Sequence, residues 1–237
     1  MIGFLLWFKN QINHIFKQGG DFLHYQTILF DLDGTLTDSF EGITKCVRYA
    51  LESMGISVSC LEELSCFIGP PLRVSFAEFY QMNEHQIEQA IAKYRERFRE
   101  VGIYENALYQ GVVEMIQKLH QNGLTLCIAS SKPRIFIERI LTHFGLDSYF
   151  QIVVGSELDG TLDEKSQVIQ AAIERSYAQP DTTVMVGDRK FDAQGAMENQ
   201  IDFIGACYGF GREKELCDYP HVFLAQTPLE IADFLLK

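Results

Sequence analysis

Two aspartates that follow a short apolar run are the residues of this chain best suited to chemistry. The run 27–30 has the composition of a buried strand, and Asp31 and Asp33 come directly after it. Side chains alternate between the two faces of a strand, but both carboxylates can serve one site if the strand ends at the first of them. A carboxylate can attack phosphorus and so divide phosphoryl transfer into two easier steps. We therefore predict that Asp31 is a nucleophile and that Asp33 transfers protons.

Further acids indicate a metal site, because two carboxylates alone would repel an anionic phosphate. A second apolar run, 184–187, is followed by Asp188 and Asp192. If a helix begins near Arg189, both carboxylates can point back at one cation. Carboxylate oxygens suit Mg²⁺, which neutralises charge at such sites. The sequence therefore predicts a magnesium site, and the alternative is that Asp188 is a simple helix cap.

A hydroxyl group and a lysine complete the set. Ser130 follows the apolar run 124–129 and precedes an expected helix start near Pro133, where backbone N–H groups can bind a phosphoryl oxygen. Lys165 opens another helical segment and can offset the charge of nucleophile and phosphate together. Taken singly, a serine before a helix is more often a cap, and a lysine on a helix is usually solvated. The strand ends that carry these groups should meet at one edge of a parallel sheet, where ligands bind.

The elements that must position these residues alternate between strand and helix, which predicts an α/β fold with a Rossmann-like doubly wound parallel sheet. Strands are expected near 26–31, 124–129, 151–154, 183–186 and 201–205, with a helix near 111–122. In the segment 38–106 the strand signal disappears, and helices are expected at 40–54, 72–81 and 84–101. We therefore predict a core of residues 26–37 and 107–237 with an inserted helical cap, 38–106, whose closure excludes water.

These motifs together resemble those of the haloacid dehalogenase-like hydrolase superfamily. The resemblance rests on 31–38 (DLDGTLTD), 130–133 (SSKP), Lys165 and 187–192 (GDRKFD), and it extends over about residues 26–237. The segment Ile68-Gly-Pro-Pro-Leu-Arg73 is similar to the phosphoglycolate phosphatase-like branch. What the resemblance implies is a magnesium-dependent phosphatase that forms an aspartyl-phosphate.

The resemblance also implies roles for single residues. They are Asp31 as nucleophile, Asp33 as acid and base, Ser130 and Lys165 as ligands of the phosphoryl group, Asp188 with the Asp31 side chain and the Asp33 carbonyl as magnesium ligands, and Asp192 as support for the metal or for Lys165. Ser166 follows Lys165 where the family often has proline, so Lys132 stays a competing candidate. The acid at Asp33 favours phosphate-ester hydrolysis, because the resembling dehalogenases lack an acid there.

The expected substrate is a small phosphorylated metabolite, with phosphoglycolate as the first candidate. The alternative is a 5′-nucleotidase that acts on nucleoside monophosphates. Gly34, Ser131 and Arg73 are the candidates for further substrate contacts. A regulatory module that binds phosphate without turnover is a third reading, and the intact pair of Asp31 and Asp33 argues against it.

Composition restricts the partners and the compartment. A net charge of −12 argues against a nucleic-acid polymer, which would need a basic face. Six cysteines without a CxxC pair indicate reduced thiols and a cytoplasmic protein. Residues 1–25 have apolar side chains at helical spacing, and we expect an extra helix packed on the domain, with a membrane-surface helix as the alternative. The segment is too short to span a bilayer, so no stable membrane association is expected.

Overall fold

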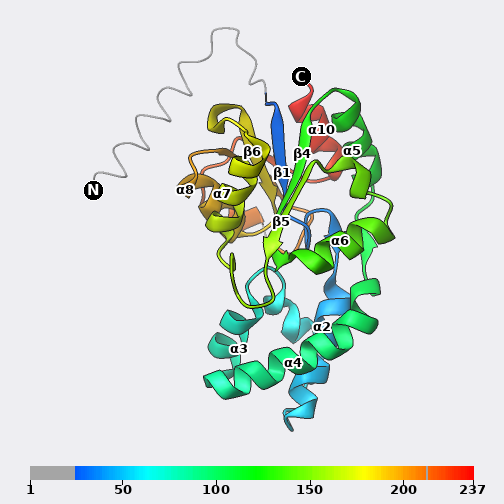
Figure 1. Cartoon of the computed structure of the whole chain (residues 1–237), viewed down its shortest axis with the longest axis vertical. Helices are drawn as coiled ribbons and strands as arrows, with labels where there is room; N and C mark the ends of the chain where they lie inside the picture. Colours follow the sequence, from blue (N-terminus) through cyan, green and yellow to red (C-terminus); the bar gives the residue numbers. More distant parts are fainter. Residues whose placement is uncertain (1–24, 212) are drawn as a thin grey trace, which may run out of the picture.

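A parallel six-stranded sheet forms the centre of the molecule (Figure 1). The computed structural model describes residues 25–211 and 213–237. The strand order β5-β4-β1-β6-β7-β8 places the first strand between β4 and β6. The strands are β1 (Thr27–Phe30), β4 (Thr125–Pro133), β5 (Ile152–Ser156), β6 (Thr183–Gly187), β7 (Asp202–Ala206) and β8 (Phe223–Ala225).

The sheet is buried on both faces, as expected for parallel strands joined by helical crossovers. Successive residues of β1 show this, because Ile28 and Phe30 pack in one apolar cluster while Leu29 packs in the other. Three helices cover the first face and three others the second (Figure 1). The first set is α5 (Val112–Gln121), α6 (Arg134–His143) and α10 (Pro228–Leu235), and the second is α7 (Lys165–Ser176), α8 (Lys190–Glu198) and α9 (Glu213–Cys217).

A helical cap is inserted after the first strand. The short strands β2 (Thr37–Asp38) and β3 (Ala107–Leu108) pair antiparallel and carry the chain into the cap and back. Between them lie α2 (Phe40–Ser53), η1 (Leu61–Phe67), α3 (Leu72–Tyr80), α4 (Glu84–Glu100) and η2 (Gly102–Tyr104). Helix α4 begins with a capping box between Asn83 and Gln86, and its buried face packs against α2.

The predicted α/β fold with a parallel sheet is confirmed, and most expected elements lie within a few residues of their observed ends. Strand β8 and the β2–β3 pair were not predicted, because segments of two or three residues show no periodicity. The expected N-terminal helix falls almost entirely in residues 1–24, outside the described residues. None of the helices described in residues 25–237 has the length and hydropathy needed to cross a membrane.

Candidate active site

The end of β1 delivers both motif aspartates to the carboxyl edge of the sheet. The strand ends at Phe30, and the backbone N–H of Asp31 donates to the Val186 carbonyl of β6 at 2.9 Å. Asp31 and Asp33 are both buried, and both line a cavity between the core and the cap. The early end of the strand lets two acids that would otherwise alternate serve one site, as the sequence predicted.

Behind the nucleophile candidate lies Lys165, at the first position of α7. Its Nζ is 2.7 Å from Asp31 Oδ1 and 2.8 Å from Asp192 Oδ1, and it also donates to the Ala129 carbonyl at 3.2 Å. Burial alone would lower the pKa of this ammonium, but Asp192 and Asp31 raise it above its usual value. Lys165 is therefore a buried cation fixed beside Asp31 and not a solvated surface lysine.

Asp192 lies in the first turn of α8, and both of its carboxylate oxygens have partners. Oδ1 pairs with Lys165, and Oδ2 accepts from the backbone N–H of Arg189 at 3.0 Å. Burial raises the pKa of Asp192 to about 6; Lys165 opposes this shift, and the charge of Asp31 adds to it. Asp192 contacts Lys165 directly, which is one of the two supporting roles predicted for it, and support of a metal ion stays a prediction.

Asp188 is completely buried, directly after β6. Its Oδ2 accepts from the backbone N–H groups of Phe210 and Gly211, at 2.7 and 3.2 Å, in the loop after β7. Helix α8 begins only at Lys190, and Asp188 accepts from this loop and from the Thr35 hydroxyl but not from the helix amides, so it is not a helix cap. Burial, and then the charges of Asp192 and Asp31, raise the pKa of Asp188 well above its usual value.

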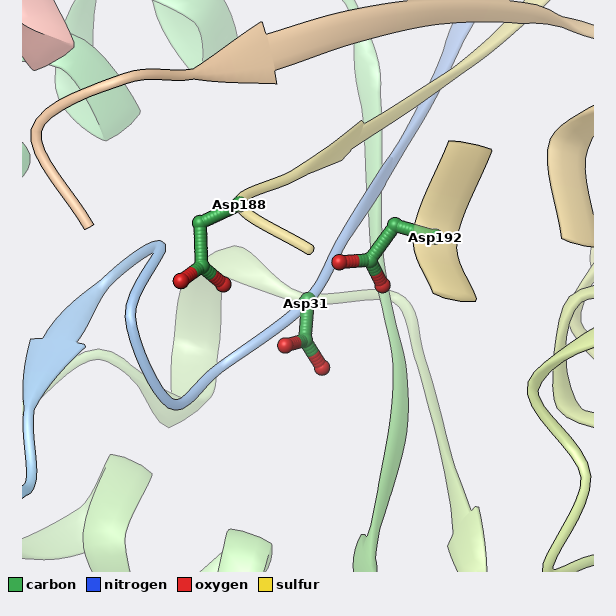
Figure 2. A group of neighbouring side chains, drawn as sticks. All are labelled: Asp31, Asp188 and Asp192. Carbon is green, nitrogen blue, oxygen red and sulfur yellow. The ribbon is translucent and has the colours of Figure 1, made fainter. Parts of the chain in front are cut away.

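Three of these acids gather closely enough to hold one metal ion. Oxygens of Asp31, Asp188 and Asp192 lie within 4.8 Å of one another (Figure 2). They come from the loop after β1, the loop after β6 and the first turn of α8. Lys165 supplies one positive charge against three carboxylates, so negative charge is left over. A hard divalent cation such as Mg²⁺ fits both this charge surplus and the oxygen donors.

Asp33 lines the cavity, and its two oxygens differ in their contacts. Its Oδ2 accepts from Lys132 Nζ at 2.6 Å, whereas buried Oδ1 has no hydrogen-bond partner in the described part of the chain. The Lys132 ammonium also lies 4.8 Å from the centre of the Phe98 ring of α4. Lys165 and Lys132 therefore serve different carboxylates, and the position predicted for Lys165 beside the nucleophile candidate is the one observed.

The hydroxyl motif forms the end of β4. The pairing of β4 with β5 shifts register between Ser130 and Pro133, which turns this segment out of the regular ladder. Ser130, Ser131 and Lys132 all line the cavity as a result. Ser130 itself is buried, and the Ser131 carbonyl accepts from the Ser156 hydroxyl at 2.8 Å.

Gly34 has a different place from the one predicted. It is not among the residues that line the cavity, and its N–H donates to the Thr37 carbonyl at 2.7 Å inside the loop. Its φ is +91°, and a Cβ at this position would lie 2.2 Å from Asp188 Oδ2. Glycine is needed here because the turn requires positive φ and because the loop passes directly against the Asp188 carboxylate.

The cap contributes an apolar wall with two arginines. Arg73, which was predicted to contact the substrate, lines the cavity, and its guanidinium is bonded to Glu84 and Glu88. Arg95 of α4 also lines the cavity, is half-buried, and pairs with no carboxylate among the described residues. Burial lowers the pKa of Arg95, and the neighbouring Arg99 adds to this. The apolar residues that the cap contributes to the lining include Ile43, Phe67, Leu72, Ile91 and Phe98.

Sequence reasoning missed Arg95 and the loop that holds Asp188. Arg95 lies in a helix with many charges, and nothing in its spacing separates it from solvated neighbours. The loop carries Gly209-Phe210-Gly211 directly after a strand, and such a glycine pattern could have indicated close backbone packing.

Comparison with known proteins gives several matches. Residues 28–206 match the family model described as haloacid dehalogenase-like hydrolase. The chain is 44% identical over 194 residues to a 5′-nucleotidase from Pseudomonas aeruginosa, covering 82% of this chain and 88% of that one. It is 25% identical over 202 residues to a phosphoglycolate phosphatase from Colwellia psychrerythraea, covering 82% and 89%. The crystal structure of a predicted phosphatase from Clostridium acetobutylicum has a TM-score of 0.87 and 42% identity, covering 90% and 99%.

Proposed function

The chain belongs to the haloacid dehalogenase-like hydrolase family and is a phosphatase, and from this premise we propose that it hydrolyses nucleoside 5′-monophosphates in a magnesium-dependent reaction through an aspartyl-phosphate. The observation that carries the proposed chemistry is the buried group of Asp31, Lys165 and Asp188 at one edge of the sheet. The substrate class is supported by similarity to a 5′-nucleotidase and by the lining of the cavity.

Asp31 is the nucleophile in this proposal. Lys165 holds Oδ1 at 2.7 Å, which orients the carboxylate and leaves Oδ2 for attack on phosphorus. The bond from Asp31 to phosphorus forms as the ester bond to the leaving oxygen breaks. The Ser130 hydroxyl and the Lys165 ammonium stabilise the phosphoryl oxygens, because fixed donors and cations in a buried site need little reorganisation during reaction.

Asp33 is the proton carrier. Its protonated form donates to the leaving alkoxide, and the resulting carboxylate then takes a proton from the water that attacks the aspartyl-phosphate. The second step releases phosphate and restores both acids, so protons balance over one cycle. Lys132 orients Asp33 Oδ2 at 2.6 Å, and Asp33 lines the cavity in which the leaving group would lie.

Asp31 and Asp188 are the proposed side-chain ligands of Mg²⁺, together with the Asp33 carbonyl. Asp192, whose oxygens are bound to Lys165 and Arg189 N–H, keeps this cluster in place. When bound, the cation supplies charge neutralisation between the carboxylates and the phosphate. The phosphate-binding part of the site is thus proposed to be complete only in the metal-loaded protein.

The cavity wall favours a leaving group with an apolar face. Phe67, Ile91 and Phe98 offer a surface suited to a nucleobase, whereas phosphoglycolate is small and would leave this surface uncovered. Phosphoglycolate and related phosphorylated carboxylates are the second candidate, and Arg95 favours them. A guanidinium without an ion pair that faces a cavity is suited to a substrate carboxylate.

The deciding experiment measures phosphate release from nucleoside 5′-monophosphates, phosphoglycolate, sugar phosphates and pyrophosphate, with Mg²⁺ and with a chelator. We expect magnesium-dependent turnover, with kcat/KM highest for a nucleoside monophosphate. A preference for phosphoglycolate would reverse the order of the two candidates. Binding of phosphate without turnover across the panel would instead identify a regulatory module and contradict the proposed catalytic roles.

A further inference from the structure

Arg189 reaches from the core to the cap. It directly follows Asp188 and is the N-cap residue of α8. The Nη1 group donates to the Ile68 carbonyl, which is 121 positions away in the chain and belongs to the cap. The segment that follows, Gly69–Pro71, lines the substrate cavity. One side chain thus bonds a segment of the cavity wall to the part of the core that carries Asp188 and Asp192.

The guanidinium is held from the core side as well. Its Nε donates to Glu215 Oε1 of α9 at 3.1 Å, and the same oxygen accepts from the backbone N–H of Lys190 at 2.9 Å. Only 15% of the Arg189 side chain is exposed, so its hydrogen bonds are largely shielded from water. A charged hydrogen bond in such a place is stronger than an exposed one.

The cap loop is shaped to accept this side chain. Gly69 has φ +106°, and a Cβ there would lie 3.0 Å from Arg189 Nη1 and 3.1 Å from its Cγ. A larger residue would therefore meet both backbone strain and the guanidinium. The two chain segments fit each other at one point, which argues against a chance surface contact.

We propose that Arg189 is a positioning residue that holds the cap loop 68–71 against the core and so shapes the substrate cavity. The role needs arginine in particular, because Nε and Nη1 donate in different directions, to Glu215 and to Ile68. A lysine would keep the charge but could not bridge both acceptors in this geometry. The proposal extends the proposed function by naming what fixes the cavity wall, and part of its test does not depend on that function.

The matched control is Arg139 of α6. This residue is also a core guanidinium that donates to cap groups, the Arg99 carbonyl at 2.9 Å and the Tyr104 hydroxyl at 3.1 Å. None of these three residues lines the substrate cavity. Arg189→Lys and Arg139→Lys therefore make the same chemical change at two contacts between core and cap, only one of which involves the cavity wall.

The first measurement is amide hydrogen exchange of residues 66–73 in the full chain. We expect faster exchange in Arg189→Lys and no change in Arg139→Lys, because only the first variant releases the loop. Gly69→Ala should reproduce the faster exchange from the other side of the contact. Unchanged exchange in Arg189→Lys would overturn the proposal, and this outcome can be read even if the protein hydrolyses none of the phosphates tested.

The second measurement separates positioning from a general loss of structure. With the best nucleotide substrate, Arg189→Lys should raise KM about tenfold, as for the loss of a hydrogen bond to a charged group, while kcat for p-nitrophenyl phosphate changes less than about twofold. The rise in melting temperature that Mg²⁺ causes should be the same in the variant as in the parent. An equal rise of KM in Arg139→Lys, or loss of the magnesium effect, would assign the result to cap docking or to the metal site and overturn the proposal.

Discussion

The catalytic edge of the core and the cap wall opposite it use their charges in different ways. At the core edge, Lys165 joins Asp31 and Asp192, and Lys132 joins Asp33, so buried ions hold one another at 2.6 to 2.8 Å. In the cap, Arg73 is bonded to two glutamates of its own unit, and Arg95 stands without an ion pair among the described residues.

This difference indicates that the core edge performs the reaction and that the cap wall discriminates between substrates. The buried ion pairs fix the geometry of the nucleophile and the proton carrier before substrate arrives, and such preorganisation is what phosphoryl transfer requires. The cap wall is mainly apolar, and it can discriminate only by shape and by its few free polar groups. Changes at the core edge should therefore alter kcat for every substrate, whereas changes in the cap should alter KM for some substrates and not for others.

The largest effect is expected from Asp31→Asn. The amide cannot form the aspartyl-phosphate, so kcat should fall by at least about 10⁴-fold for all substrates. The fold should survive, because Asn keeps an oxygen that can accept from Lys165. Steady-state phosphate release and thermal denaturation test both statements. Asp38→Asn, which changes an exposed acid in the same motif, is the control and should keep full activity. Appreciable turnover in Asp31→Asn would contradict the covalent mechanism.

A smaller loss is expected from Asp33→Asn, about 10² to 10⁴-fold in kcat for alkyl phosphates, the range of general acid–base catalysis. The first step should be spared with p-nitrophenyl phosphate, because its leaving group departs without a proton. Burst-phase kinetics would then show the aspartyl-phosphate accumulating, since Asp33 is also needed to activate water. Equal losses in the first step for both types of ester would exclude the role as acid.

The core edge could be predicted from sequence because each of its groups occupies a fixed place after a strand or at a helix start. Asp31 follows the apolar run that forms β1. The strands β4 and β6, which pair with β1, bring Ser130 and Asp188 to the same edge of the sheet, and this placement does not depend on the loops. The sequence could not predict that Gly34 lies under Asp188 and not along the cavity, because that depends on how a turn with positive φ packs on a neighbouring loop.

The cap was predicted only as a set of helices. Arg73 lies along the cavity, but the sequence gives no sign that Glu84 and Glu88, from another helix, take up its charge. Arg95 has no such partner in the part of the chain that the structure describes. An acid that paired with it would have to come from another element, and the sequence pattern does not show how that element packs against α4. Contacts between helices depend on packing angles, and single-residue spacing carries little information about them.

The third prediction concerns the stability of the core edge, first in the parent protein and then in Asp188→Asn. The pKa values of Asp188 and Asp192 are raised in the folded protein, so the folded state binds more protons than the unfolded state above about pH 4. Without metal, stability should therefore fall as pH rises through about 6, the folded-state pKa of Asp192. Mg²⁺ should restore stability, and more at pH 7 than at pH 5.

Asp188→Asn removes one of the repelling charges. The metal-free variant should melt at least about 2 °C higher than the parent at pH 7, equivalent to about 1 kcal/mol in a chain of this size, and should lose most of the stabilisation by Mg²⁺. Thermal denaturation at pH 5 and pH 7, with Mg²⁺ and with chelator, measures all of this. A variant that is less stable than the parent without metal, or one that Mg²⁺ stabilises as much as the parent, would contradict a metal site built around Asp188.

The smallest effect, and the one that tests the cap alone, is expected from Arg95→Gln. If its free guanidinium serves a substrate carboxylate, KM for phosphoglycolate should rise about tenfold, while KM for a nucleoside monophosphate and kcat for both should stay within about twofold. Arg99→Gln is the matched control, because it removes the same charge from an exposed position of the same helix. A rise of KM for the nucleotide alone would place the guanidinium against the leaving nucleoside. An equal rise for both substrates, or the same effect in Arg99→Gln, would mean that Arg95 acts through general electrostatic attraction, and selection would then rest on the apolar wall.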